Sequence, residues 1–165
     1  MNIEIKSVRR AAHELERNRG YHVVSLREAS LRGKQHPVDR FLRKCRSSIV
    51  MYFDDVWLPE HESMGWVLPT REQIAAILDW AKGKDGFLVH CKAGISRSSA
   101  VAYAIGCQMA SASEAFKLLD TSNHRPNELI VRLAADILED PEVYRVWASV
   151  YGDDLFEGLL NEVAP

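Results

Sequence analysis

The chain has 165 residues, a formal net charge of −2, 47% hydrophobic residues and 27% charged residues. This length allows one domain with one core, expected over residues 1–165, and the composition is ordinary for a soluble globular protein. The slightly acidic balance argues against a general nucleic-acid binder.

The cysteines and the N-terminus indicate the compartment. Cys45, Cys91 and Cys107 form no disulfide framework and no metal-ligand spacing, so no metal or other cofactor is expected. Residues 1–5 lack the apolar core of a signal peptide, and no stretch is long enough to cross a membrane. We therefore expect a cytoplasmic protein without a membrane partner. The sequence leaves its oligomeric state open.

The first half of the chain combines apolar runs of strand type with one amphipathic helix. Apolar residues at helical spacing indicate a helix from Val8 to Asn18, which Gly20 ends. The polar segment from Arg27 to Pro37 is expected to be a loop. The connector from Asp54 to Pro69 is longer than most loops of compact domains, which is typical of a lid. The strands expected here are 3–6, 21–26 and 47–53.

A capping box marks the start of the next helix. Thr70 is the expected cap and Gln73 reaches back to it, so the helix runs from there to about Ala81. A strand is expected from Phe87 to His90. Further helices are expected at 97–109, about 113–119, about 127–138, 141–151 and 153–162. Strands that alternate with helices predict an α/β fold with a mainly parallel central sheet of about four to five strands, flanked by helices.

The most informative segment joins this last strand to the helix that begins near residue 97. It reads His90-Cys91-Lys92-Ala93-Gly94-Ile95-Ser96-Arg97-Ser98-Ser99. Where a loop curls into a helix N-terminus, backbone N–H groups converge on one point and bind an anion. A cysteine at the base of such a cradle has a stabilised thiolate and is a nucleophile. An arginine at the helix start donates two hydrogen bonds to a tetrahedral anion.

The segment resembles the signature loop of the cysteine-dependent protein phosphatases: His-Cys, two residues, Gly, two residues, Arg, then Ser or Thr. All of these positions match, and the resemblance extends from about residue 21 to 138. The short length, the order of elements and a Pro-Asn pair at 126–127 are similar to the compact dual-specificity and tyrosine phosphatases. A bacterial source stays open. The resemblance implies that Cys91 is the nucleophile. It implies a phosphate site of Lys92, Ala93, Gly94, Ile95, Ser96 and Arg97.

A second requirement is an acid, because a departing alkoxide or phenoxide needs a proton. In this family the acid is an aspartate on a loop well before the cysteine, and Asp55 precedes Cys91 by 36 residues. Neighbouring residues of an extended segment point to opposite sides, so only one of Asp54 and Asp55 faces the pocket. The resemblance favours Asp55 as the acid. Asp54 is then expected to serve a turn or cap.

The resemblance also assigns roles to three supporting residues. Ser98 matches the hydroxyl that donates to the departing thiolate in the second step, which leaves Ser96 or Ser99 to cap the helix. His90 matches the histidine that fixes the cysteine loop by hydrogen bonding. Asn127 matches an asparagine that braces the loop through backbone bonds, and it is equally typical of a plain helix start.

Charge and tryptophan positions add two expectations. The segment from Arg27 to Arg46 is strongly basic, and the chain from Glu139 onward is strongly acidic. The basic segment is either a solvated face or a rim beside the anion pocket that favours acidic substrates. Trp57 and Trp66 in the connector are expected to be packing anchors.

Together these features and the resemblance predict a phosphatase that hydrolyses phosphate monoesters of proteins or small phosphoesters through a cysteinyl-phosphate. Phosphotyrosine is an expected substrate, and the sequence leaves open whether phosphoserine and phosphothreonine are substrates too. RNA 5′-phosphatases share the scaffold, and phosphoinositide phosphatases carry a second lysine near Ile95 that this chain lacks. Rivals of other classes are a silent phosphate-binding module and a rhodanese-type sulfurtransferase. The complete set of nucleophile, arginine and acid argues against the first, and Gly94, Ser98 and Asp55 argue against the second. No nucleic-acid partner is expected.

Overall fold

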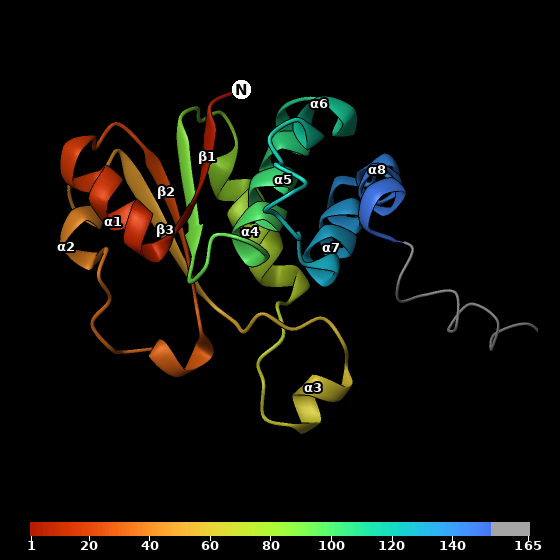
Figure 1. Cartoon of the computed structure of the whole chain (residues 1–165), viewed down its shortest axis with the longest axis horizontal. Coiled ribbons are helices and arrows are strands. Elements are labelled where there is room, and N and C mark those ends of the chain that lie inside the picture. Colours follow the sequence, from red (N-terminus) through yellow and green to blue (C-terminus); the bar gives the residue numbers. More distant parts are fainter. Residues whose placement is uncertain (153–165) are drawn as a thin grey trace, which may run out of the picture.

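The centre of the molecule is a parallel four-stranded sheet. The structure, a computed structural model, describes residues 1–152 (Figure 1). The strand order is β1-β4-β2-β3, and every neighbouring pair is parallel. The strands are β1 (Ile3–Ser7), β2 (His22–Arg27), β3 (Ser47–Tyr52) and β4 (Phe87–Cys91). The predicted α/β fold with a parallel sheet is therefore confirmed.

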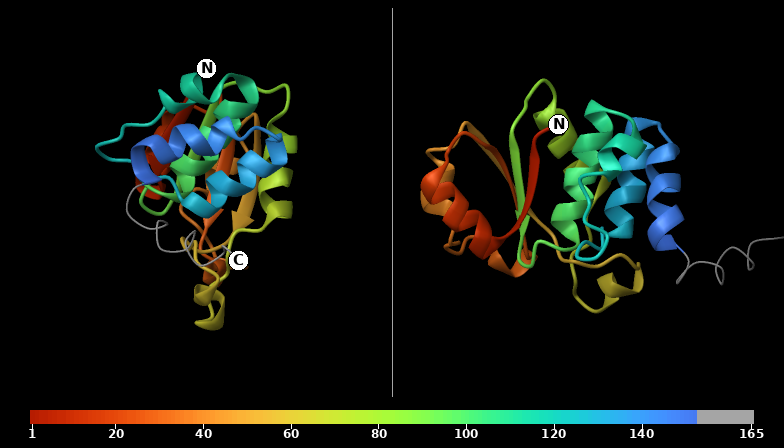
Figure 2. Two further views of the ribbon diagram at one scale, coloured as in Figure 1. Left: turned by 90° about the vertical axis from the view of Figure 1, so that its right-hand side faces the viewer. Right: turned by 45° about the horizontal axis from the view of Figure 1, so that its top comes forward.

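Helices cover both faces of this sheet (Figures 1 and 2). The first two lie on one face, and α4 to α8 lie on the other, while α3 projects beyond the end of the sheet. The helices are α1 (Val8–Arg17), α2 (Asp39–Leu42), α3 (Glu60–Ser63), α4 (Arg71–Ala81), α5 (Arg97–Met109), α6 (Ala112–Phe116), α7 (Glu128–Leu138) and α8 (Glu142–Tyr151), with a 3₁₀ turn η1 (Ala29–Leu31).

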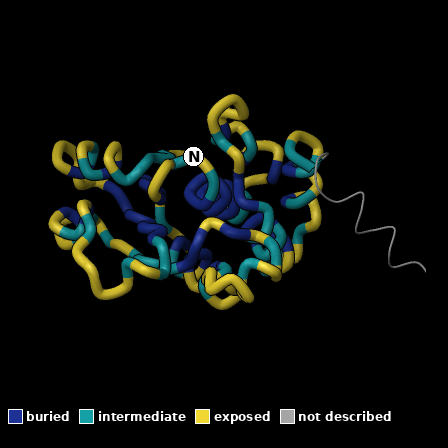
Figure 3. Tube along the Cα trace, turned by 60° about the horizontal axis from the view of Figure 1, so that its bottom comes forward, coloured by how far each residue is buried: buried dark blue, intermediate teal, exposed yellow. Residues whose placement is uncertain are grey.

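Two apolar clusters hold these layers together. The larger cluster joins the sheet to α4, α5 and α7, and it continues to α8 through Trp147. The smaller cluster lies under α1 and contains Leu15, Tyr21 and Phe41. Helix α5 is buried without a break from Arg97 to Gly106, and the burial pattern of the trace is shown in Figure 3. A polar side chain at the start of this helix is therefore held in a rigid, largely dry setting.

The helix signals of the sequence agree with these elements. The capping box is confirmed: Thr70 Oγ1 accepts from the Gln73 backbone N–H at 3.3 Å, and Gln73 Oε1 accepts from the Thr70 N–H at 3.0 Å. Three short turns, η1, α2 and α3, were not predicted, because three or four residues are too few to show a helical period. The helix expected at 153–162 lies outside the described residues.

The strand register places the loop that follows Cys91 at the carboxyl end of the sheet. Ser7 at the end of β1 lies opposite Cys91 at the end of β4, and Ser25 of β2 lies opposite His90. In open α/β sheets, ligands bind outside the carboxyl ends of the strands. Among residues 1–152, no helix has the length and apolar character needed to cross a bilayer.

Candidate active site

The loop from Cys91 to Arg97, here called the signature loop, connects β4 to the buried helix α5. Cys91 is only 1% exposed and sits at the base of the loop. The Gly94 backbone N–H donates to Cys91 Sγ at 3.2 Å, and Ser98 Oγ lies 3.2 Å from the same sulfur. Both donors stabilise negative charge on the sulfur. The predicted role of Ser98 requires this contact.

Gly94 cannot be replaced without moving the loop. Its φ of +79° is in the left-handed region, and a Cβ there would lie 2.5 Å from the Ser7 backbone nitrogen and 2.7 Å from the Lys6 carbonyl carbon. The loop therefore rests directly on the end of strand β1. A backbone bond from Val8 N–H to the Lys92 carbonyl, at 3.3 Å, fixes the same contact.

The Arg97 guanidinium is oriented by three groups that are distant in sequence. Its side chain is 3% exposed, and Nη1 donates to the Phe53 carbonyl at 2.9 Å. Glu28 Oε1 lies 3.5 Å from Nη2, and Asp55 Oδ2 lies 3.9 Å from Nε. The guanidinium is therefore buried and oriented. Phe53 and Glu28 were not foreseen, because no short motif marks a backbone carbonyl or a single glutamate in a distant loop.

Asp55 lies against the signature loop. Its Oδ1 accepts hydrogen bonds from Ser96 Oγ at 2.7 Å and from Asn127 Nδ2 at 3.1 Å. The side chain is 37% exposed, so one side of the carboxylate remains open to a ligand. Of the two candidate aspartates, this is the one whose carboxylate reaches the cysteine loop.

Asp54 points the other way and closes a loop. The acid loop, defined here as Asp54–Val67, returns on itself at this residue: Asp54 N–H donates to the Val67 carbonyl at 2.7 Å, and its carboxylate accepts from the Val67 N–H at 2.9 Å. The same carboxylate accepts from the Ala29 N–H at 3.2 Å. Asp54 thus fastens the acid loop to itself and to η1, a structural role of the kind expected for it.

Asn127 connects three parts of the site. Its backbone N–H donates to the Ser96 carbonyl at 3.4 Å, which is the predicted backbone brace. Its side chain does more than was predicted, because Nδ2 donates to Asp55 Oδ1 and to the Val56 carbonyl at 3.2 Å. Its Oδ1 accepts from Ile130 N–H at 3.2 Å and so caps α7.

The expectation that Ser96 or Ser99 caps α5 is wrong. Ser96 occupies the cap position, but its side chain makes no capping bond and instead donates to Asp55. Ser99 Oγ donates back to the carbonyls of Ile95 and Ser96, the latter at 2.8 Å. The first N–H groups of α5 therefore lack a side-chain cap, which leaves them available to an anion in the loop.

The His90 ring is fully buried, and neither ring nitrogen makes a hydrogen bond of good geometry within residues 1–152. A backbone hydrogen-bonding contact with Cys91 does contribute to its pKa, so the expected role of His90 in fixing the cysteine loop stays a prediction. The ring stacks on His36 with 5.7 Å between centroids. Burial lowers the pKa of His90 to about 3, so the ring is neutral at physiological pH.

The outer rim of the signature loop is exposed. The side chain of Lys92 is 78% exposed and lies 3.7 Å from Glu28, and Ile95 is 43% exposed. A cavity of about 380 Å³ lies beside this contact and is lined by Lys92 and by residues of the segment Glu28–Pro37. The rim of the loop is therefore at the surface, while Cys91 at its base is buried.

Two expectations about surface residues need correction. Arg27 is no part of an exposed basic rim: it is 3% exposed, pairs with Asp39 at 2.6 Å and donates to Ser25 Oγ at 3.0 Å. The ion pair with Asp39 holds the Arg27 guanidinium in the protein interior. Trp57 and Trp66 are not packing anchors, since they are 39% and 48% exposed on the acid loop.

Among the described residues, no group of three or more His, Cys, Asp or Glu side chains could hold a metal ion.

Comparisons with known proteins bear on the fold. No protein-family model matches the chain, and no curated protein matches it either. The PTP-2 phosphatase of Cydia pomonella aligns with a TM-score of 0.56 and 19% identity over 82% of this chain and 85% of that one. PTPMT1, solved in complex with PI(5)P, aligns with a TM-score of 0.53 and 15% identity over 84% and 93%. Human DUSP28 aligns with a TM-score of 0.50 and 19% identity over 83% and 91%.

The chain therefore has the fold of the dual-specificity and tyrosine phosphatases. At these identities the likeness concerns the fold, and the chemistry rests on the residues described above. Cysteine, arginine and aspartate meet at one loop at the carboxyl end of the sheet, as the signature-loop resemblance implies.

Proposed function

We propose that this chain is a phosphatase that hydrolyses phosphate monoesters through a cysteinyl-phosphate intermediate. The observation that carries the proposal is the position of Asp55. It lies 36 residues before Cys91, yet its carboxylate accepts a 2.7 Å hydrogen bond from Ser96 in the signature loop. A buried thiol, an oriented arginine and a carboxyl group thus surround one anion-binding loop.

In the first step the Cys91 thiolate attacks phosphorus. The P–S bond forms as the P–O bond to the leaving group breaks, and the leaving oxygen takes a proton from Asp55. Arg97 and the backbone N–H groups of the loop hold the remaining phosphoryl oxygens, whose charge is spread in the transition state. Because Phe53 and Glu28 hold the guanidinium in place, little reorganisation is needed when the substrate binds.

In the second step water attacks phosphorus and the P–S bond breaks. The Asp55 carboxylate, now ionised, takes the proton of the water. The departing thiolate is stabilised by the Ser98 hydroxyl and the Gly94 N–H, each at 3.2 Å from Sγ. Inorganic phosphate leaves, and the enzyme returns to its starting state.

The exposure of the loop supports a broad choice of phosphoamino acids. Lys92 and Ile95 lie at the surface on the rim of the loop, while Cys91 is 1% exposed at its base. Phosphoserine and phosphothreonine have shorter side chains than phosphotyrosine and need a shallow site, which the exposed rim residues favour. We propose phosphorylated proteins as substrates, with the whole chain acting as one domain in the cytoplasm, where thiols stay reduced.

The test is turnover of p-nitrophenyl phosphate by the wild type and by Cys91→Ser. The serine hydroxyl stays protonated, so turnover should be lost, while Arg97 and the loop amides should still bind a phosphate ester. Residual activity within about tenfold of the wild type would contradict the cysteine mechanism. Turnover of thiosulfate in place of the phosphoester would point to a sulfurtransferase.

A second candidate is a phosphoinositide, because PTPMT1 was solved with PI(5)P and shares this fold. Phosphoinositide phosphatases carry a second lysine near the position of Ile95, and its absence from this chain argues against a phosphoinositide. Phosphopeptides, PI(5)P and RNA 5′ ends compared in one assay would rank the three classes.

A further inference from the structure

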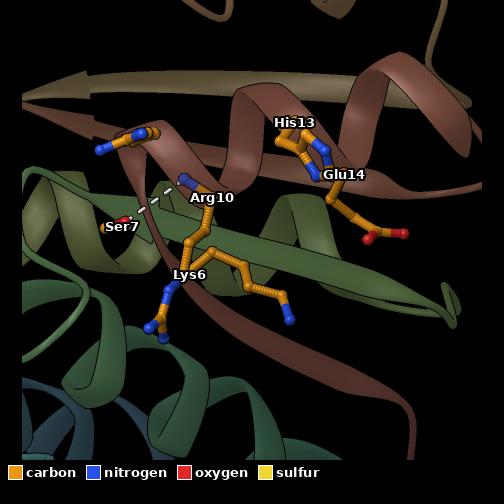
Figure 4. Close-up of a pocket in the computed structure, with 6 residues that line it drawn as sticks. Lys6, Ser7, Arg10, His13 and Glu14 are labelled. Carbon is orange, nitrogen blue, oxygen red and sulfur yellow. Dashed lines mark hydrogen bonds between the residues drawn. The ribbon is translucent and has the colours of Figure 1, made fainter.

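A second cavity lies at the junction of β1 and α1. Its volume is about 430 Å³, and Figure 4 shows the residues that line it. Strand β1 contributes Lys6 and Ser7, and helix α1 contributes the rest; Ser7 Oγ accepts from the Arg10 backbone N–H at 3.3 Å. We call this cavity the basic pocket. Its lining residues are Lys6, Ser7, Arg9, Arg10, His13 and Glu14.

The two arginines of the basic pocket form no ion pairs, although the Glu14 carboxylate shares the pocket with them. Arg9 and Arg10 are exposed, and neither forms an ion pair with a described residue. The other charged groups have partners: Lys6 pairs with Glu4 at 3.0 Å, and Glu14 accepts from the Tyr21 hydroxyl at 3.2 Å. The free donors in the pocket are therefore guanidinium groups, which bind phosphate and carboxylate oxygens in pairs.

The position of these arginines works against the stability of the helix. Both lie in the first turn of α1, which contains no acidic residue. The positive end of the helix dipole repels cations there. Residues that oppose a local preference without a compensating contact are typical of functional surfaces.

The basic pocket adjoins the signature loop. Ser7 lies opposite Cys91 in the register of β1 and β4, so their backbones are about 4.8 Å apart, one strand spacing. Gly94 packs directly on Lys6 and Ser7. The signature loop and the basic pocket therefore share Lys6 and Ser7 as their common border.

We propose that the basic pocket binds a second anionic group, a phosphate or a carboxylate, on the same phosphoprotein substrate. This inference rests on the proposed phosphatase function and adds a substrate preference to it. A protein fits better than a nucleic acid or a membrane surface, because the net charge is −2 and the exposed Glu60 and Glu62 of the projecting acid loop repel an extended polyanion.

The experiment compares two peptides that differ only in one phosphate. Both carry a non-hydrolysable phosphonate in place of phosphotyrosine, and one also carries a phosphoserine two residues away. Binding to the full-length protein is measured by calorimetry. We expect the second phosphate to tighten binding by about tenfold, as a charged hydrogen bond does. Raising the salt concentration should weaken this advantage.

Two charge-reversed variants locate the effect. Arg9→Glu/Arg10→Glu should abolish the preference for the doubly charged peptide, and Arg43→Glu/Lys44→Glu is the control. The control residues are also exposed and lack ion pairs with described residues, and the change of charge is the same. Because acidic residues in the first turn stabilise a helix, unfolding of α1 cannot explain a loss in the test variant.

The outcomes are distinct. Equal affinity of the wild type for both peptides, or a preference that survives Arg9→Glu/Arg10→Glu, would overturn the inference. Vesicles with phosphoinositide that bind more tightly than either peptide, and lose binding in the same variant, would assign the pocket to a lipid surface instead. Turnover of p-nitrophenyl phosphate is measured in parallel: its absence would contradict the phosphatase function alone, since peptide binding does not depend on turnover.

Discussion

Asn127 and Asp55 are joined by a hydrogen bond of 3.1 Å although 72 positions separate them in sequence. The same Asn127 amide donates to the Val56 carbonyl, and its oxygen caps α7 at Ile130. The start of α7 therefore holds the candidate acid in place. An asparagine suits this position because it offers two donors and an acceptor on one short side chain.

Substitution of Asn127 should separate positioning from stability. Asn127→Asp keeps an oxygen for the α7 cap but cannot donate to Asp55, and it places a second carboxylate beside it. We expect kcat for phosphotyrosine to fall by about 10–100-fold, because small misplacements of a catalytic group have effects of this size. Asn127→Ala also loses the cap, with a decrease of about 1 kcal/mol in the free energy of unfolding.

The readout that identifies positioning is the leaving group. If Asn127→Asp lowers phosphotyrosine and p-nitrophenyl phosphate turnover equally, the asparagine does not act through the acid. Stability from urea unfolding, measured for both variants, shows how much of any loss is due to folding.

The two aspartates should respond differently to removal of their charge. Tyrosine leaves as a phenol of pKa about 10 and needs a proton, whereas p-nitrophenol is more acidic and needs it less. Asp55→Asn should therefore lower phosphotyrosine turnover by about 10²–10⁴ and remove the basic limb of the kcat/KM profile. Steady-state kinetics on both substrates, over a range of pH, measure this.

Asp54→Asn provides the matched comparison. It disturbs the bonds to Ala29 and Val67, so we expect a loss of about 1–3 kcal/mol in unfolding free energy with the leaving-group dependence intact. The reverse pattern, with leaving-group dependence in Asp54→Asn alone, would exchange the roles. If neither variant shows it, the acid lies elsewhere.

The three cysteines should differ in reactivity toward iodoacetamide and peroxide. Burial raises the pKa of Cys45, and burial raises the pKa of Cys107 to about 12. A raised pKa leaves almost no thiolate at pH 7, and the thiolate is the reactive form. Cys91 has two donors on its sulfur and should react first, with protection by vanadate. Mass spectrometry that finds Cys45 or Cys107 modified earlier would contradict this.

His90 should make the protein less stable in mild acid. Its pKa is about 3 in the folded state and about 6.5 when unfolded, so protons bind preferentially to the unfolded chain between these values. The stabilisation from neutral His90 is complete above pH 6.5 and is lost as the pH falls, by about 2 kcal/mol at pH 5. His90→Phe should show a shallower slope in urea unfolding between pH 6.5 and 5. An unchanged slope would show that His90 does not titrate in this way.

Local signals predicted most of the fold. The helix 97–109 has the expected ends, and Thr70 with Gln73 forms the expected capping box, because both depend on neighbours within a few residues. The parallel sheet followed from the alternation of strands and helices. The turns η1 and α2 lie in a polar segment whose conformation is set by Asp39 and Asp54, and no pattern within the segment shows this.

The candidate site was predictable where a motif is contiguous, and beyond it only for Asp55 and Asn127, which the family resemblance assigned. Cys91, Gly94 and Ser98 lie within eight residues, and their contacts follow from the loop itself. The bond from Arg97 to Phe53 spans 44 positions and depends on packing. For the same reason the sequence could not show that Arg27 is buried against Asp39, and the count of charges there predicted either a solvated face or a rim beside the pocket.

The closure of the acid loop at Asp54 has an evolutionary consequence. Because the base of the loop is fastened on both sides, the acid beside it keeps its place whatever the tip contains. The tip carries Trp57, Met64 and Trp66, whose side chains are exposed and contribute little to the core. Insertions, deletions and new side chains at the tip should therefore leave Asp55 in place. Adaptation to a new protein partner would begin at this tip, while the base and the cysteine loop stay unchanged.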